Sequence, residues 1–262
     1  MVQTLVSRAL TPFVESLDHI QGDTVPALER VLPNARVHLM VNLDEDEFRT
    51  YEGAAVQRTK GAVLAGPHSE ATVIDTREQR HLVTVNFRLG GAARFFDTPL
   101  GETRDQLIEL DLLWGRDGAV LREQLLEAPT PAATLQILES TLLRHLVDAR
   151  EPDPAIAFAA RAFERGGSIA QVTEHLGLLP KTFVRRFRNQ AGVTPKRFSR
   201  VRRLQRLVQS IRDPRAADWA ELAVQHGYTD QAHLIHDFRE LTGLTPAAYR
   251  PRSYEERNHV PV

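Results

Sequence analysis

The chain has 262 residues, of which 42% are apolar and 26% are charged, enough for about two domains of roughly 150 residues. It contains no cysteine, which excludes disulfides, thiolate nucleophiles and cysteine-ligated zinc. No stretch approaches the roughly 18 uninterrupted apolar residues of a membrane helix, and the first residues lack the apolar core of a signal peptide. We therefore expect a cytoplasmic protein that does not contact a membrane.

The net charge of −1 conceals two halves of opposite sign. Residues 161–262 carry 18 basic against 10 acidic side chains, a net +8, whereas residues 1–160 carry 15 against 24, a net −9. From His175 to Arg212 there are 11 basic residues and no acidic one. This asymmetry favours a polyanion-binding half joined to one that does not touch the polyanion, with a solvated helix face as the simpler alternative for the basic run.

The first part of the chain is predicted to form strands and the part after it to form helices. Residues 36–43 and 81–87 partly alternate polar and apolar side chains, the period of a strand, and glycines punctuate the first 101 residues. After Glu102, leucines recur at helical spacing. Residues 148–154 are charged and hold two prolines, which predicts a linker and two domains, 1–152 and 153–262.

One predicted helix, residues 134–146, presents leucines at spacings of three and four: Leu135, Leu138, Leu142 and Leu146. Such a stripe either packs on the β-rich domain or forms a contact between two subunits. Packing on the domain is the favoured interpretation, and a homodimer would still add specificity by doubling the number of binding heads.

The second half contains an internal repeat of about 50 residues. Ser168 with Gln171, and Asp218 with Glu221, each have the spacing of a capping box that begins a helix. A glycine follows nine residues after Ser168 and after Asp218, and a second helix is expected beyond it. We therefore predict two helix-turn-helix units, at about residues 168–190 and 218–240.

The end of each unit repeats as well. Phe187 and Phe238 are each followed, five residues later, by a glycine and a Thr-Pro pair. Between the units, residues 195–211 have apolar side chains at the spacing of one amphipathic helix, which would hold the units in a fixed relation.

The stretches GLLPKTFVRRFRNQAGVTPKRF and GYTDQAHLIHDFRELTGLTPAAYR resemble the two helix-turn-helix units of AraC/XylS-type transcription regulators. The resemblance covers about residues 155–250. It implies an α+β protein with an amino-terminal, β-rich, cupin-like sensor or dimerisation domain with flanking helices, followed by an all-α DNA-binding domain whose units are joined by a long helix. It also implies double-stranded DNA as a partner, modulation by a small-molecule effector or by homodimer formation, and RNA polymerase as a further partner if the protein is an activator.

Base contacts are predicted on the exposed face of the second helix of each unit. In the first unit, Phe183 and Phe187 share the buried face, and the family pattern indicates Lys181, Val184 and Arg185. In the second unit, Leu234 and Phe238 are expected to be buried, and the pattern indicates Gln231, His233 and His236, with a solvated surface as the alternative for each histidine. Arginine suits guanine and glutamine suits adenine.

Phosphate contacts are expected from a wider set of basic residues, which position a protein on DNA without reading its sequence. The candidates are Arg186, Arg188, Lys196, Arg197, Arg200, Arg239 and Arg250.

No catalytic site or cofactor is predicted. His38, His68 and His81 lack the spacing of a metal set, and neither a phosphate-binding glycine loop nor a nucleophile elbow is present. The alternative function is a cupin-type enzyme or a sugar-binding protein whose basic half tethers it to nucleic acid.

Overall fold

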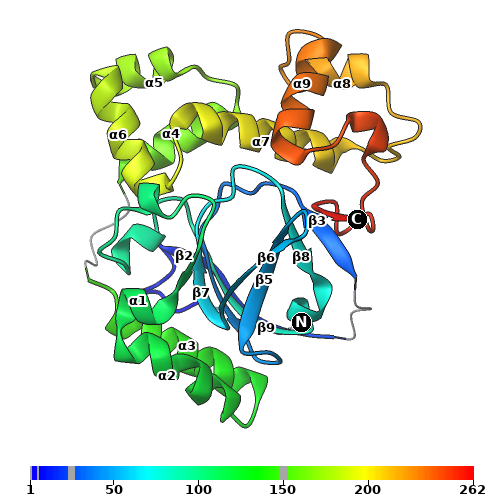
Figure 1. The fold of residues 1–262 in the computed structure, drawn as a ribbon. Helices are drawn as coiled ribbons and strands as arrows, with labels where there is room; N and C mark the ends of the chain where they lie inside the picture. The colour runs from blue at the N-terminus through cyan, green and yellow to red at the C-terminus, as the bar shows by residue number, and fades with distance from the viewer. Residues whose placement is uncertain (1, 5, 23–26, 148–152) are drawn as a thin grey trace.

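The computed structural model describes residues 2–4, 6–22, 27–147 and 153–262. The chain folds into a β-rich part and a helical part, and the helices α4 to α9 lie across one end of the strands (Figure 1). The predicted combination of a β-rich amino-terminal half and a helical carboxy-terminal half is confirmed, except that residues 259–261 form a strand where only helices were predicted.

Within the described residues, the β-rich part consists of two antiparallel sheets. The first has the order β1-β2-β9-β4-β7-β10, with the strands Val2–Thr4, Val14–Gln21, His81–Phe87, His38–Asn42, Ala62–Ala65 and Leu107–Glu109. The second has the order β11-β3-β8-β5-β6, with the strands His259–Pro261, Leu28–Val31, Thr72–Asp75, Glu47–Glu52 and Ala55–Lys60. Short 3-10 helices follow β8 and β9: η1 (Thr76–Gln79), η2 (Ala92–Arg94) and η3 (Leu100–Glu102). The predicted strands at 36–43 and 81–87 are confirmed as β4 and β9.

Three helices cover the end of the β-rich part that lies away from the helical part (Figure 1): α1 (Leu110–Trp114), α2 (Arg116–Leu126) and α3 (Pro131–Arg144). Thr130 begins α3 by accepting a hydrogen bond from the Ala133 amide at 3.2 Å. Leu135, Leu138 and Leu142 are buried in the same apolar cluster as the inward side chains of β2. The predicted packing of this helix on the β-rich domain is confirmed, and it is hydrophobic burial that holds it there.

The helical part contains α4 (Pro154–Glu164), α5 (Ile169–Leu176), α6 (Pro180–Ala191), α7 (Pro195–Ser210), α8 (Trp219–Gln225), α9 (Gln231–Thr242) and the short η4 (Pro246–Ala248). The predicted connecting helix over residues 195–211 is confirmed as α7. Of the predicted linker, only Asp153 and Pro154 lie within the described residues, and the Asp153 carboxylate caps α4. No helix of the described chain is both long and apolar enough to cross a bilayer.

The last strand was not predicted. After η4 the chain leaves the helical part and returns to the β-rich part, where β11 pairs with β3 (Figure 1). Val260 of β11 lies in the apolar cluster of the helices, together with Leu32 and Ala35 from the end of β3 and the turn after it. The two parts therefore share buried apolar surface, which the division of the sequence at residue 152 does not anticipate.

Candidate nucleic-acid interface

The two predicted helix-turn-helix units are present. We call α5 with α6 the first unit and α8 with α9 the second unit. Ser168 and Gln171 form a reciprocal capping box, with bonds of 3.2 and 2.8 Å, and Gly177 ends α5 in the left-handed conformation at φ +62°. In the second unit, Asp218 accepts from the amides of Ala220 and Glu221, both at 3.0 Å. The Glu221 side chain accepts from Gln225 instead, so this cap is one-sided.

The helices α6 and α9 each expose a polar face because their apolar residues are buried on the other side. Phe183 and Phe187 of α6, and Leu234 and Phe238 of α9, have no exposed surface. The rings of Phe187 and Phe198 lie 5.4 Å apart, which ties α6 to the connecting helix α7. Each unit therefore holds its second helix on a buried aromatic side chain, as the repeat predicts.

The base-contact candidates of α6 lie at its amino-terminal end. Lys181 and Arg185 are exposed, and within the described chain neither has an ion pair or a side-chain hydrogen bond. Val184, between them on the surface, is half-buried. The first unit thus offers two free cations beside one apolar contact.

The candidates of α9 are less uniform. Gln231 and His236 are exposed, and the His236 ring lies 3.7 Å from Glu240. His233 is half-buried: its Nδ1 lies 3.2 Å from the Thr229 amide and hydroxyl, and its ring packs edge-on against Tyr228. The structure therefore gives His233 a position inside the turn of the second unit, whereas Gln231 and His236 face outward.

The phosphate candidates divide into free and paired side chains. Lys196 and Arg239 are exposed and have no partner in the part of the chain that the structure describes. Arg188 is exposed but lies against Gly101 of η3, and Arg250 bonds the carbonyls of Ala247 and Tyr249.

The other three candidates are held by carboxylates. Arg186 is paired with the buried Asp153. Arg197 pairs with Glu240 and with Glu70 of the β-rich part, both at 3.1 Å. Arg200 pairs with Asp237 at 2.7 Å and Glu240 at 2.6 Å. These ion pairs lie within the protein, so such arginines contact phosphate only if they exchange partners.

Asp237 was not predicted as a site residue. Its side chain is only 4% exposed, and its two oxygens accept from Arg200 and Arg203 of α7, at 2.7 and 2.6 Å. The Arg203 guanidinium also lies over the Tyr228 ring, 4.2 Å from its centre. A sequence signal exists, because Asp237 lies three residues after Leu234 and four before Leu241, on the buried side of α9. A buried acid needs cationic partners, and the ion pairs of Asp237 with Arg200 and Arg203 hold α9 against the connecting helix α7.

The hydrogen bond from Arg200 lowers the pKa of Glu240 to about 2, so this carboxylate is charged at any physiological pH. Burial raises the pKa of the Tyr228 hydroxyl to about 12. Glu240 and Tyr228 therefore keep their charge states near neutral pH.

The β-rich part encloses an apolar cavity of about 190 Å³ between its sheets. His38 and His68 lie in its wall, together with apolar side chains of both sheets and His259 of β11. Burial lowers the pKa of His38 to about 4 and also lowers that of His68, so both rings are neutral at pH 7. His81 lies elsewhere, with its Nε2 atom 3.1 Å from that of His19, so the three histidines considered as a metal set do not meet.

A helix-turn-helix domain family matches residues 172–252, and a domain of unknown function, DUF6597, matches residues 4–109. The XylDLEGF operon transcriptional activator of Pseudomonas putida is 24% identical over 117 residues, 43% of this chain and 36% of that protein; the XylDLEGF operon transcriptional activator 1 of the same organism matches equally. The chain thus spans about a third of the length of these curated relatives.

Solved structures of ToxT from Vibrio cholerae are also similar. One is 9% identical, covers 90% of this chain and 98% of ToxT, and has a TM-score of 0.44. Another, of unsaturated fatty acid bound ToxT, is 11% identical, covers 89% of this chain and 92% of that one, and has a TM-score of 0.42.

Proposed function

We propose that this chain, whose residues 172–252 form a helix-turn-helix domain of the AraC/XylS type, is a transcription regulator that reads two adjacent major-groove segments of double-stranded DNA. The observation that carries the proposal is the repeated geometry of α6 and α9: each is fixed on a buried phenylalanine and turns polar side chains outward from one shared helix, α7. A helix held in this way is the element that enters a major groove.

The first unit supplies base contacts through Lys181 and Arg185, with Val184 toward a thymine methyl group. A free arginine donates two parallel hydrogen bonds to guanine, which discriminates by about 1–3 kcal/mol against another base. Arg185 is exposed and unpaired within the described chain, so it reaches DNA without breaking an internal bond.

The second unit supplies base contacts through Gln231 and His236. Glutamine matches the donor and acceptor of adenine in the major groove. His233, although predicted to contact a base, acts from this half-buried position by shaping the turn before α9, because its ring binds the Thr229 backbone.

Lys196 and Arg239 are the phosphate contacts that the geometry favours most, since both are exposed and free within the described residues. Arg188 and Arg250 add positive charge nearby. The paired Arg186, Arg197 and Arg200 join them only after exchanging a carboxylate for a phosphate, a step that costs part of the binding energy.

The β-rich part is the candidate effector domain. Its cavity of about 190 Å³ is slightly larger than an apolar cavity of roughly 150 Å³ known to accept benzene. His38 and His68 are neutral and offer hydrogen bonds, and the wall also contains Arg49 and Glu78, which pair with each other at 3.1 Å. The cavity therefore suits a compact, largely apolar molecule with one polar end. A homodimer, and RNA polymerase as a partner of an activator, follow from the resemblance and stay predictions.

The experiment is selection of duplexes from a random DNA pool by the full chain at near-physiological salt. Two enriched blocks about one helical turn apart are expected. Salt-sensitive binding without enrichment would contradict the proposal, because phosphate contacts alone carry no sequence information.

A further inference from the structure

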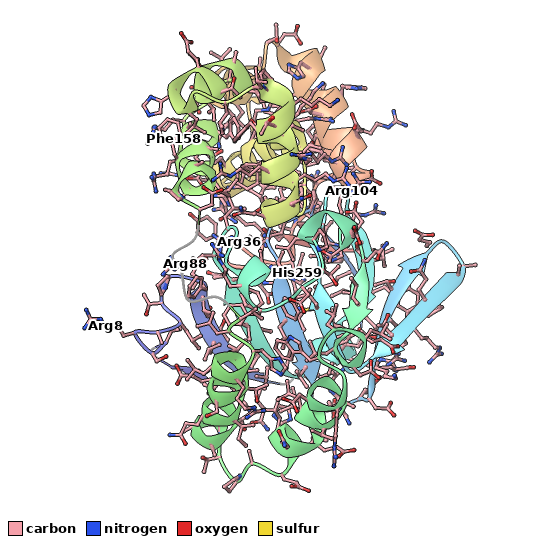
Figure 2. All side chains as sticks on the ribbon, turned by 90° about the vertical axis from the view of Figure 1, so that its left-hand side faces the viewer. Arg8, Arg36, Arg88, Arg104, Phe158 and His259 are labelled. Carbon is pink, nitrogen blue, oxygen red and sulfur yellow. The ribbon has the colours of Figure 1, made fainter. Side chains whose placement is uncertain are left out.

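The last residues of the chain are bound to both parts of the molecule. Tyr249 is fully buried against the second unit, its ring 5.7 Å from that of Phe238 in α9. From there the chain continues to β11, which pairs antiparallel with β3 so that His259 lies opposite Val31 (Figure 1). We call residues 249–262 the strap. Figure 2 shows His259 of the strap among the strands of the β-rich part, although the chain before the strap belongs to the helical part.

The β-rich part holds the strap by charge and by backbone pairing. The Glu29 side chain of β3 is 4% exposed, and its oxygens lie 3.0 Å from His259 Nδ1 and 3.3 Å from an Arg252 nitrogen. The Leu32 amide donates to the Asn258 carbonyl at 2.8 Å. A carboxylate buried without cations is costly, so removal of the strap leaves Glu29 without the cations that face it here.

The helical part also holds the strap. Arg257 is 3% exposed and donates to the carbonyls of Val208 and Gln209 at the end of α7, while the Tyr249 hydroxyl donates to the Arg257 carbonyl at 2.6 Å. A displacement of β11 therefore acts on the junction of α7 with the second unit.

The strap also contributes to the cavity of the β-rich part, because His259 lines it together with Val31 and Leu32. A molecule in this cavity contacts the strap directly. The strap is thus a short connection from the cavity to the buried core of the second unit.

While the two parts are in contact, the β-rich part binds Arg197, one of the candidate phosphate contacts. This side chain is not available to DNA as long as that contact holds. Arg197 donates to the Ser69 carbonyl at 2.7 Å and pairs with Glu70, both in the β-rich part. The Arg30 side chain and the Ala71 amide bind the carbonyls of Thr242 and Leu241 at the end of α9. Docking thereby keeps the acidic half, net −9 over residues 1–160, beside the basic half, which weakens the attraction of the latter for a polyanion.

We propose that the strap is an autoinhibitory device: paired with β3, it holds the second unit on the β-rich part and lowers DNA affinity, and a ligand that displaces His259 from the cavity wall releases it. This inference rests on the proposed function. It requires two states of the second unit, docked on the β-rich part and released from it. A ligand in the cavity and DNA both shift the equilibrium toward the released state.

The test uses the full chain with Glu29→Gln, a chain that ends at Asn258, and Glu255→Gln as the control. Glu255 is an exposed acid of the strap whose side chain forms no ion pair or hydrogen bond within the described chain, so its substitution makes the same chemical change without loosening β11. Hydrogen exchange over residues 27–32 reports strap pairing, and titration with a duplex selected by the wild type reports affinity. We expect faster exchange and at least about fivefold tighter binding for the first two variants, and no change for the control.

Faster exchange with unchanged or weaker DNA binding by Glu29→Gln would overturn the proposal, as would unchanged exchange in both variants. If the second unit of the shortened chain does not fold, the result of Glu29→Gln alone tests the proposal, because this substitution lies outside that unit. Failure of both the wild type and Glu29→Gln to select any duplex would overturn the proposed function itself, and the inhibitory role with it. Equal affinities of the two proteins for a selected duplex would overturn the role of the strap alone.

Discussion

The first and second units share one buried scaffold and differ in what surrounds their second helices. Around α6, cations face outward and Lys181 and Arg185 are free within the described chain. Below α9, Asp237 and Glu240 hold three arginines in ion pairs, and the outward residues are the uncharged Gln231 and the histidine His236. The two copies of the motif therefore differ in what they present to DNA. The first unit presents unpaired positive charge, whereas the second is fixed to α7 by ion pairs and presents hydrogen-bonding groups.

The shared scaffold gives the largest expected effect. Phe187→Ala and Phe238→Ala each remove a fully buried ring at equivalent positions, and each should cost about 3–5 kcal/mol of unfolding free energy. Urea unfolding followed by helical circular dichroism measures both. A cost below about 1 kcal/mol for either one would show that the two units are not built on the same core.

The next effect separates the units. Asp237→Asn leaves Arg200 and Arg203 without their buried carboxylate and should cost about 3 kcal/mol. Arg186, at the equivalent position of α6, is 44% exposed, and its partner Asp153 is buried but also accepts from the Ala155 amide and from Gln190. Arg186→Gln should therefore cost less, about 1–2 kcal/mol, because Asp153 keeps two of its hydrogen bonds. Urea unfolding compares the two variants, and equal costs would contradict the claim that charge holds the second unit more firmly than the first.

DNA binding should show the opposite ranking. Arg185→Ala should weaken binding to a selected duplex by about 1–3 kcal/mol and relax the base preference at one position. His236 is at the equivalent position of α9 but contacts Glu240, and His236→Ala should cost less. Fluorescence anisotropy at two salt concentrations measures both, and an unchanged affinity of Arg185→Ala would refute the assignment of α6 to the major groove.

The smallest effect concerns the glycines that end α6 and α9. Both have positive φ, +79° at Gly192 and +71° at Gly243. A methyl group on Gly192 would lie 2.4 Å from the Pro67 ring, whereas one on Gly243 would meet the flexible end of Arg30. Each alanine costs about 1 kcal/mol for its backbone, and Gly192→Ala should cost about 1 kcal/mol more. Thermal unfolding measures this difference, and an equal or reversed order would mean that α6 does not end firmly against the β-rich part.

The sequence predicted what local patterns encode: the capping residues Ser168 and Asp218, the buried Phe187 and Phe238, and the connecting helix α7. These features depend on neighbours within one or two helical turns. The partners of Arg197 and Arg200, and the pairing of β11 with β3, join residues up to about 230 positions apart, as for His259 and Glu29. The periodicity of apolar residues in the sequence indicates that a side chain is buried, but it does not indicate which distant segment covers that side chain.

The contrast between the halves has the same origin. Opposite charges in the sequence indicated separate tasks, yet the structure places the two halves in contact, with Arg197 bonded to Ser69 and Glu70. Net charge describes which polyion a half attracts in solution and does not describe what covers it in the folded chain.

The most direct measurement of the central claim is selection from a random duplex pool with the full chain beside its Arg185→Ala and Gln231→Ala variants. The account predicts two enriched blocks about one helical turn apart. Arg185→Ala should reduce the base preference in one block, and Gln231→Ala should reduce it in the other. A single enriched block, or two variants that alter the same block, would contradict tandem reading by α6 and α9.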